Sequence, residues 1–415
     1  MTQTDVGGTV LTTRSPPSLR RNARFQTLWA GSAASLLGAR MADTAYPLLL
    51  LSMTGSPSVA GAFGAVQLAA TLAFGLHGGS IADRCDRRKV LIIADGIRCL
   101  ITSSIPVALW LHCLTVAQTM LVAVSIGAAT AYGAPSRLLA VRSVVPQAQL
   151  RQALAQDEAR SNGAGLIGPP VAGLLFGLAR MAPFIGTALG SFTAFLAACL
   201  VRFDGRAGGR RGGGPGGGAL EGLRYLARSR ELRPTLAVAC ALNVTAMAVT
   251  LPVVVLLRSH HTASGGIGLA LSGEAVGGIA GAFLIGRLHR MMRPGKLLLI
   301  STWACVPLLF APLLPGGPVT VFLSLAVMML TLPALRVMID VLIFQRVDDA
   351  LRGRVVSATM NLFMLGMPAG LLGSGLLVDH TSPAVTFAVL AALLTAALVP
   401  ATRSASLRAT DWPAT

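Results

Sequence analysis

GGSIADRCDRRKV, at residues 78–90, places six charged side chains within the seven consecutive positions 83–89. The stretch lies between two long apolar segments, in a chain of 415 residues of which 53% are hydrophobic and only 12% are charged. A water-soluble domain carries about a quarter of its residues as charged ones. The composition therefore indicates a membrane protein, and the quoted stretch is one of its few strongly charged connections.

Apolar runs long enough to cross a bilayer recur along the whole chain. A membrane-spanning helix needs roughly 20 predominantly apolar residues. The sequence contains twelve such runs, at residues 27–53, 58–78, 90–111, 117–136, 161–180, 182–201, 235–257, 266–286, 297–314, 318–344, 355–378 and 383–401. We therefore predict an all-α membrane protein with twelve transmembrane helices.

The Lys and Arg residues indicate the direction of these helices. Of the 34, 29 lie in the two terminal segments and in every second connection, whereas the alternate connections hold only Arg180 and Arg258. Because Lys and Arg accumulate on the cytoplasmic side, we expect both termini in the cytoplasm and a multi-pass protein of the cytoplasmic (inner) membrane. This placement explains the net charge of +18, so we expect no nucleic-acid partner.

The longest polar connection, residues 204–234, divides six predicted spans from six. It contains the flexible sequence GGGPGGG, followed by ALEGLRYLARSRELR, for which we expect a short helix lying on the inner leaflet. The predicted organisation is an N-terminal half at 1–203, a cytoplasmic linker at 204–234 and a C-terminal half at 235–415. The halves share short motifs at corresponding places, which favours a transporter with its site between them.

The charged stretch falls between the second and third predicted spans, on the predicted inner side. It resembles the signature G-x-L-A-D-R-x-G-R-R/K of the major facilitator superfamily through Gly79, Asp83, Arg84, Arg87 and Arg88, with Asp86 at the usual glycine. The resemblance implies the twelve-helix fold of that superfamily and a conformational latch. In such a latch the aspartate caps the N-terminal end of a helix in the second half, and ion pairs of Arg84 and Arg87 reorganise during transport.

A second motif lies in the fifth predicted span. Residues 159–175, ARSNGAGLIGPPVAGLL, resemble the antiporter motif g-x-x-x-G-P-x-x-G-G of drug–proton exporters through Gly168, Pro169 and Gly173. Glycine and proline permit close helix packing and a bend. Beyond this motif, residues 21–51, 135–160 and 347–362 resemble the macrolide and enterobactin exporter branch, a class of drug–proton antiporters. This implies proton-coupled efflux of an antibiotic, a siderophore or another small amphipathic metabolite.

Ionisable residues within the predicted spans are candidate functional residues, because they are costly in a bilayer. Three oppositely charged pairs have the spacing to meet on one helix face: Arg40 and Asp43, Asp95 and Arg98, Arg336 and Asp340. Mutual neutralisation is the alternative interpretation of each pair. Asp95 lies near the start of its span and close to the latch, which favours a structural role there.

Glu274 differs from these pairs because no cation lies within one helical turn of it. A low dielectric favours its neutral form, which suits proton coupling. The alternative is a hydrogen-bonded glutamate beside a packing face formed by Gly273, Gly277 and Gly281. We take Asp43, Arg40, Glu274, Arg336 and Asp340 as candidate coupling residues. We favour Asp43 over Glu274, because the resemblance places the first span at the cavity.

Other classes of protein are less well supported by the sequence. The six cysteines show no CxxC or metal-ligand spacing, and no GxSxG or HExxH motif is present, so we predict neither an enzyme nor a cofactor or metal. The alternatives are uptake of a small nutrient by the same fold and, more remotely, a membrane enzyme or sensor. The expected partners are a small molecule, protons and the lipid bilayer, with the chain acting as a monomer.

The latch interpretation predicts that Asp83→Asn leaves the protein inserted in the membrane but slows transport strongly. A neutral amide caps a helix end less well than a carboxylate and cannot form ion pairs with arginine. Flux of a transported compound in proteoliposomes checks this, and near-normal flux in the variant would contradict the latch.

Overall fold

The computed structural model describes residues 19–201, 224–229, 232–330, 347 and 349–404, and every regular element within these ranges is a helix. The α-helices with defined bounds are α1 (Ala23–Thr54), α2 (Pro57–Arg84), α3 (Arg87–Trp110), α4 (Val116–Val144), α5 (Leu150–Leu178), α6 (Ala182–Leu200), α8 (Leu232–Ala248), α9 (Thr250–Ser259), α10 (Ser264–Leu271), α11 (Gly273–Met291), α12 (Pro294–Leu308), α13 (Gly317–Met329), α15 (Asp349–His380) and α16 (Pro383–Arg403). A helix satisfies its own backbone hydrogen bonds, which a membrane span requires.

Nine helical segments of the described chain are long and apolar enough to cross a membrane, and they match nine of the twelve predicted spans. The other three predicted spans correspond to α1, α5 and α13. Helices α1 and α5 are 32 and 29 residues long but carry polar side chains, and the continuation of α13 lies outside the described residues. Two predicted spans are interrupted, at Val249 between α8 and α9 and at Ser272 between α10 and α11.

Most of the predicted linker lies outside the described residues. Residues 224–228 are helical, and Leu226 is 3% exposed and belongs to the main hydrophobic core. Leu226 therefore packs against the protein, and α8 follows from Leu232, three residues before the predicted start of that half.

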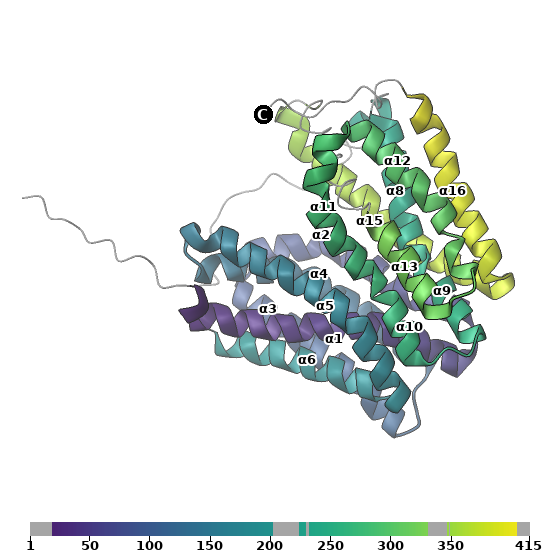
Figure 1. Ribbon diagram of the computed structural model, residues 1–415. Helices are drawn as coiled ribbons and strands as arrows, with labels where there is room; N and C mark the ends of the chain where they lie inside the picture. The colour runs from purple at the N-terminus through teal and green to yellow at the C-terminus, as the bar shows by residue number, and fades with distance from the viewer. Residues whose placement is uncertain (1–18, 202–223, 230–231, 331–346, 348, 405–415) are drawn as a thin grey trace, which may run out of the picture.

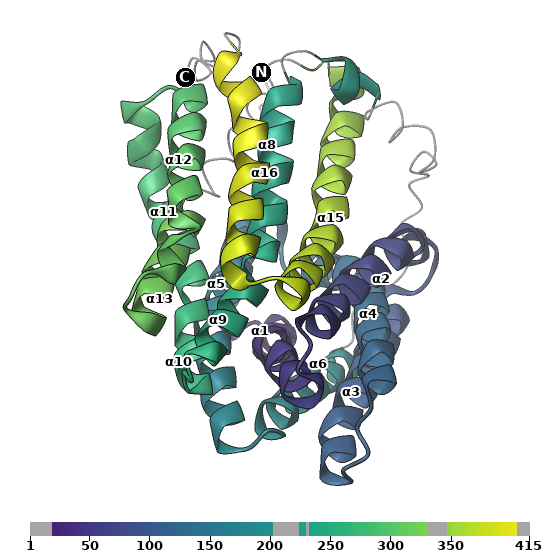
Figure 2. The same ribbon diagram turned by 90° about the vertical axis from the view of Figure 1, so that its right-hand side faces the viewer.

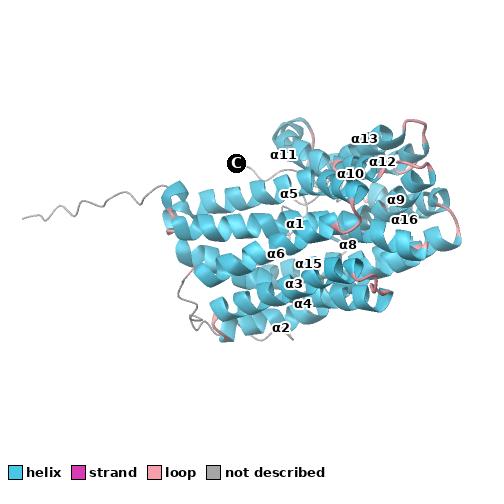
Figure 3. Cartoon of the chain, turned by 90° about the horizontal axis from the view of Figure 1, so that it is seen from below, coloured by secondary structure: helices cyan, strands magenta, loops and turns pink. Residues whose placement is uncertain are grey.

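Helices α1 to α6 form one group, in which α1 runs between α5 and α6 (Figure 3). Small residues set the distance between α1 and α6, because a methyl group on Gly190 would lie 2.3 Å from the carbonyl oxygen of Ala34. Tyr46 of α1 stacks on Phe63 of α2 with ring centroids 4.1 Å apart. These contacts hold α1 at the centre of the group.

Helices α8 to α16 form a second group, in which α8 packs against α15 and α16, and α11 packs against α13. The contact between α11 and α13 uses glycines spaced four residues apart. They face main-chain carbonyl oxygens of α13, with Gly273 opposite Phe322, Gly277 opposite Ala326 and Gly281 opposite Leu330. The packing face predicted for these glycines is confirmed.

The two groups are inclined to each other, and α2 and α15 diverge from a contact at one end (Figure 1, Figure 2). This end carries the α1–α2 and α9–α10 connections and is the predicted outer end. Glycines there face carbonyl oxygens of the other group: Gly61 opposite Leu371, Gly375 opposite Pro57, Gly173 opposite Ser264 and Gly268 opposite Pro169. The structure is therefore closed at the predicted outer end, through the pairs α2–α15 and α5–α10.

We expect Gly190→Ala to destabilise the protein by about 2 kcal/mol, because the added methyl group would force α1 and α6 apart. Thermal unfolding of the purified protein in detergent measures the effect. Gly177→Ala on α5 is the matched control, since its added methyl group meets no atom within 4 Å. Equal unfolding temperatures for the two variants would contradict this account of α1–α6 packing.

Candidate functional site

Arg40 and Asp43 form an ion pair on α1, as their spacing predicts, with Arg40 Nη1 and Asp43 Oδ2 3.4 Å apart. The two side chains are 46% and 53% exposed, although α1 is packed against α2, α5 and α6. The surrounding helices therefore do not enclose this ion pair completely.

Glu274 lies in the first turn of α11, just after the interruption at Ser272. The Thr250 hydroxyl, at the start of α9, donates a hydrogen bond to Glu274 Oε1 at 3.2 Å. Arg40 and Asp43, from the other helix group, lie close enough to act electrostatically on the Glu274 carboxyl group. The structure thus brings together the two acids that the sequence singled out separately.

Helix α5 holds the two sides of this cluster together. A methyl group on Gly168 would lie 2.5 Å from Arg40 Cβ, and one on Gly165 would lie 3.5 Å from Ala275 Cβ of α11. The antiporter-like motif therefore lies directly against the charged cluster. Its Pro169 and Gly173 form the α5–α10 contact between the helix groups, so the motif also contributes to closure of the predicted outer end.

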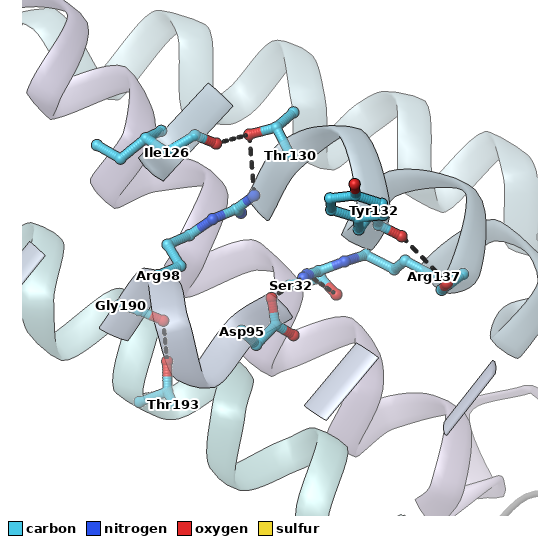
Figure 4. A network of polar contacts seen from close by, with 10 residues as sticks. Ser32, Asp95, Arg98, Ile126, Thr130, Tyr132, Arg137, Gly190 and Thr193 are labelled. Atoms are coloured by element: carbon cyan, nitrogen blue, oxygen red, sulfur yellow. Dashed lines mark hydrogen bonds and ion pairs between the residues drawn. The ribbon is translucent and has the colours of Figure 1, made fainter. Parts of the chain in front are cut away.

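A second polar cluster is buried between α1, α3 and α4 (Figure 4). Arg137 donates from Nη2 to Asp95 Oδ1 at 2.6 Å and from Nη1 to the Ser32 hydroxyl at 2.8 Å. Asp95 is only 2% exposed. Arg98 donates to the Thr130 hydroxyl at 3.0 Å. Asp95 therefore binds Arg137 of α4, and the prediction that it pairs with Arg98 is wrong, because the guanidinium of Arg98 points to α4 instead.

The latch stretch forms the end of α2, a short turn and the start of α3. Asp86 is the N-cap of α3 and accepts a hydrogen bond from the Arg88 backbone N–H at 2.9 Å. The Arg88 side chain donates to the carbonyl oxygens of Cys199 and Val201 at 2.8 and 3.2 Å, at the C-terminal end of α6. Arg88 and Asp86 thus anchor the connection within its own helix group.

The structure describes the other predicted site residues only in part. Arg87 is the first residue of α3. Gly79, Asp83 and Arg84 belong to the last turns of α2, but the surroundings of Gly79 and the side chains of Asp83 and Arg84 lie outside the described part, as do Arg336 and Asp340 altogether. Among the described residues, no group of three or more His, Cys, Asp or Glu side chains could hold a metal ion.

Sequence reasoning missed Arg137 and Thr250. The apolar run ends at residue 136, which places Arg137 in an inner connection, yet α4 continues to Val144. The sequence could have indicated this, because Arg137 continues the helical spacing of the apolar residues that precede it in α4. Thr250 carries no signal in the sequence, because its importance comes only from the neighbouring acid on another helix.

Two groups of helices, with nine segments of the described chain long and apolar enough to cross a membrane, define a multi-pass membrane protein of the major facilitator fold. The chain belongs to the transmembrane secretion effector family, whose model matches residues 14–413. The resemblance stated from the sequence is confirmed, and the chain belongs among transporters rather than enzymes.

Two efflux proteins are similar to this chain over most of its length. The chain is 28% identical over 408 residues to the multidrug efflux pump Tap of Mycobacterium tuberculosis (strain ATCC 25618 / H37Rv), covering 94% of this chain and 95% of the pump. It is 26% identical over 367 residues to macrolide efflux protein A of Streptococcus pyogenes, covering 86% of this chain and 90% of that protein.

Solved structures of transporters share the fold. The nucleoside transporter NupG superposes with a TM-score of 0.76 at 14% identity, covering 92% of this chain and 98% of NupG. A bacterial homologue of the iron transporter ferroportin, in an inward-facing state, gives a TM-score of 0.70 at 15% identity, covering 93% and 99%. The predicted fold class is confirmed by these similarities, which at such identities concern the fold alone.

The two polar clusters should respond differently to loss of an acid. Asp95→Asn should destabilise the protein by about 3 kcal/mol, because it removes a buried carboxylate and leaves the partly buried Arg137 guanidinium without its anion. Asp43→Asn, which removes an acid from a half-exposed pair, should change stability by less than about 1 kcal/mol. Thermal unfolding in detergent compares the two, and equal losses would contradict the distinction.

Proposed function

We propose that this protein exports a small amphipathic molecule, such as an antibiotic, a siderophore or another secondary metabolite, in exchange for protons by alternating access. The observation that carries the proposal is the convergence of Arg40, Asp43 and Glu274 at the junction of the two helix groups. The two relatives support transport out of the cell and the class of substrate, because one is named a multidrug efflux pump and the other a macrolide efflux protein. Export of antibiotics would lower the susceptibility of the cell to them.

The charges of the cluster supply a coupling mechanism. Arg40 can neutralise one carboxylate at a time, so the second acid must bind a proton or pair with a cationic or hydrogen-bonding group of the substrate. Arrival of substrate from the inside would displace a proton, and rebinding of a proton from the outside would displace the substrate. We retain Asp43 as the main coupling residue, because its ion pair with Arg40 can open during the cycle.

The overall movement follows from the same proposal. Residues 1–203 and 235–415 rock as two halves of a monomer in the cytoplasmic membrane, joined by the cytoplasmic linker 204–234, with both termini inside. The distribution of Lys and Arg supports this orientation. The latch residues of the α2–α3 connection would close the inner end when the outer end opens, while Arg88 keeps the connection attached to α6.

Asp43→Asn and Glu274→Gln test the coupling in proteoliposomes loaded with a labelled macrolide. If either acid couples, its amide variant should lose efflux driven by a pH gradient, yet retain binding and downhill exchange, because those steps need no net proton movement. Asp157→Asn is the matched control, since Asp157 also pairs with an arginine three residues away, Arg160, but on the inner part of α5.

Retention of full gradient-driven transport by both variants would exclude this antiport mechanism and indicate a uniporter or a differently coupled carrier. Loss of transport in Asp157→Asn as well would show that the assay reports general damage to α1–α5 packing rather than coupling.

A further inference from the structure

A polar contact joins the two helix groups at the predicted outer end. Asp379 lies in the last turn of α15, and its Oδ2 accepts a hydrogen bond of 2.8 Å from the hydroxyl of Ser56, which immediately precedes α2. Ser56 Oγ also lies 2.8 Å from Ser58 Oγ. The Ser58 hydroxyl and backbone N–H act on the same Asp379 carboxylate. The Asp379 carboxylate of the second helix group thus contacts the polar groups at the start of α2.

These groups belong to a helix end that lacks a cap of its own. Ser56 is the N-cap residue of α2, but its side chain makes no hydrogen bond to the backbone of that helix, and Pro57 follows it. The first N–H groups of a helix lack partners within it and carry a partial positive charge, so an anion there is stabilising. Asp379 supplies that anion from 323 residues away in the sequence.

Close backbone packing surrounds the contact. A methyl group on Gly375 would lie 2.9 Å from the Pro57 carbonyl oxygen, and one on Gly61 would lie 2.6 Å from the Leu371 carbonyl oxygen. Asp379 itself is exposed. When the helices separate, its carboxylate returns to water, so the contact can break without leaving an unpaired buried charge. This property distinguishes it from the buried Asp95 cluster.

We propose that Asp379, Ser56 and Ser58 form an outer latch, which caps α2 while the outer end is closed and releases it when that end opens. The proposal rests on the proposed function, because the opened state is the outward-facing state of the transport cycle. Asp83 of the expected inner latch lies at the opposite end of α2. One helix therefore carries a carboxylate-dependent contact between the halves at each end.

Hydrogen–deuterium exchange of the purified full chain tests the outer latch without substrate or proton gradient, so its result is independent of the coupling test above. Asp379→Asn should accelerate exchange about fivefold in the first turns of α2, through loss of a charge-assisted hydrogen bond. Exchange should also rise in α10, which makes the second contact at this end but does not touch Asp379. Asp379→Glu, which keeps the carboxylate, should restore most of the protection.

Ser382→Ala is the matched control, because Ser382 caps α16 at the same end through a bond within its own helix group. It should leave exchange in α2 and α10 unchanged. Acceleration confined to α2 in Asp379→Asn would show a local helix cap and overturn the latch. Unchanged exchange in that variant, or an equal effect of Ser382→Ala, would overturn it as well.

Discussion

An ionised side chain inside a bilayer must be paired, hydrated or neutralised, because its transfer into hydrocarbon is costly. This chain meets that requirement in two ways. Asp95 is buried and held by Arg137, which also binds Ser32, so three helices are fastened by one guanidinium. Arg40 and Asp43 instead remain half exposed beside Glu274. The same physical requirement is therefore met by a buried pair at Asp95 and by a half-exposed pair at Asp43.

Several close contacts between the helix groups place a glycine opposite a main-chain oxygen. At α5–α10, methyl groups on Gly173 and Gly268 would each lie 2.2 Å from a carbonyl oxygen across the contact. Backbones can approach this closely only where side chains are absent. At these positions the helix groups approach each other through their backbones, with no side chain between them.

The sequence sufficed for features that depend on local pattern. Apolar run length predicts the helices, and three-residue spacing predicts the Arg40–Asp43 pair, because both follow from helix geometry alone. The partner of Asp95 could not be predicted in this way, since it depends on how α3 and α4 rotate about their axes. The same holds for the meeting of Glu274 with Thr250 and Arg40, which requires the packing of helices from both groups.

The hydrogen bond between Thr250 and Glu274 connects two interrupted spans at their interruptions. The segments beyond these points, α9 and α10, also carry contacts with the first helix group, through Arg258 to the Leu48 carbonyl oxygen and through Gly268 to Pro169. Glu274 therefore lies where both spans are interrupted, next to the segments that contact the first helix group. In the proposed mechanism, protonation of Glu274 would therefore act directly at the two interruptions from which α9 and α10 extend.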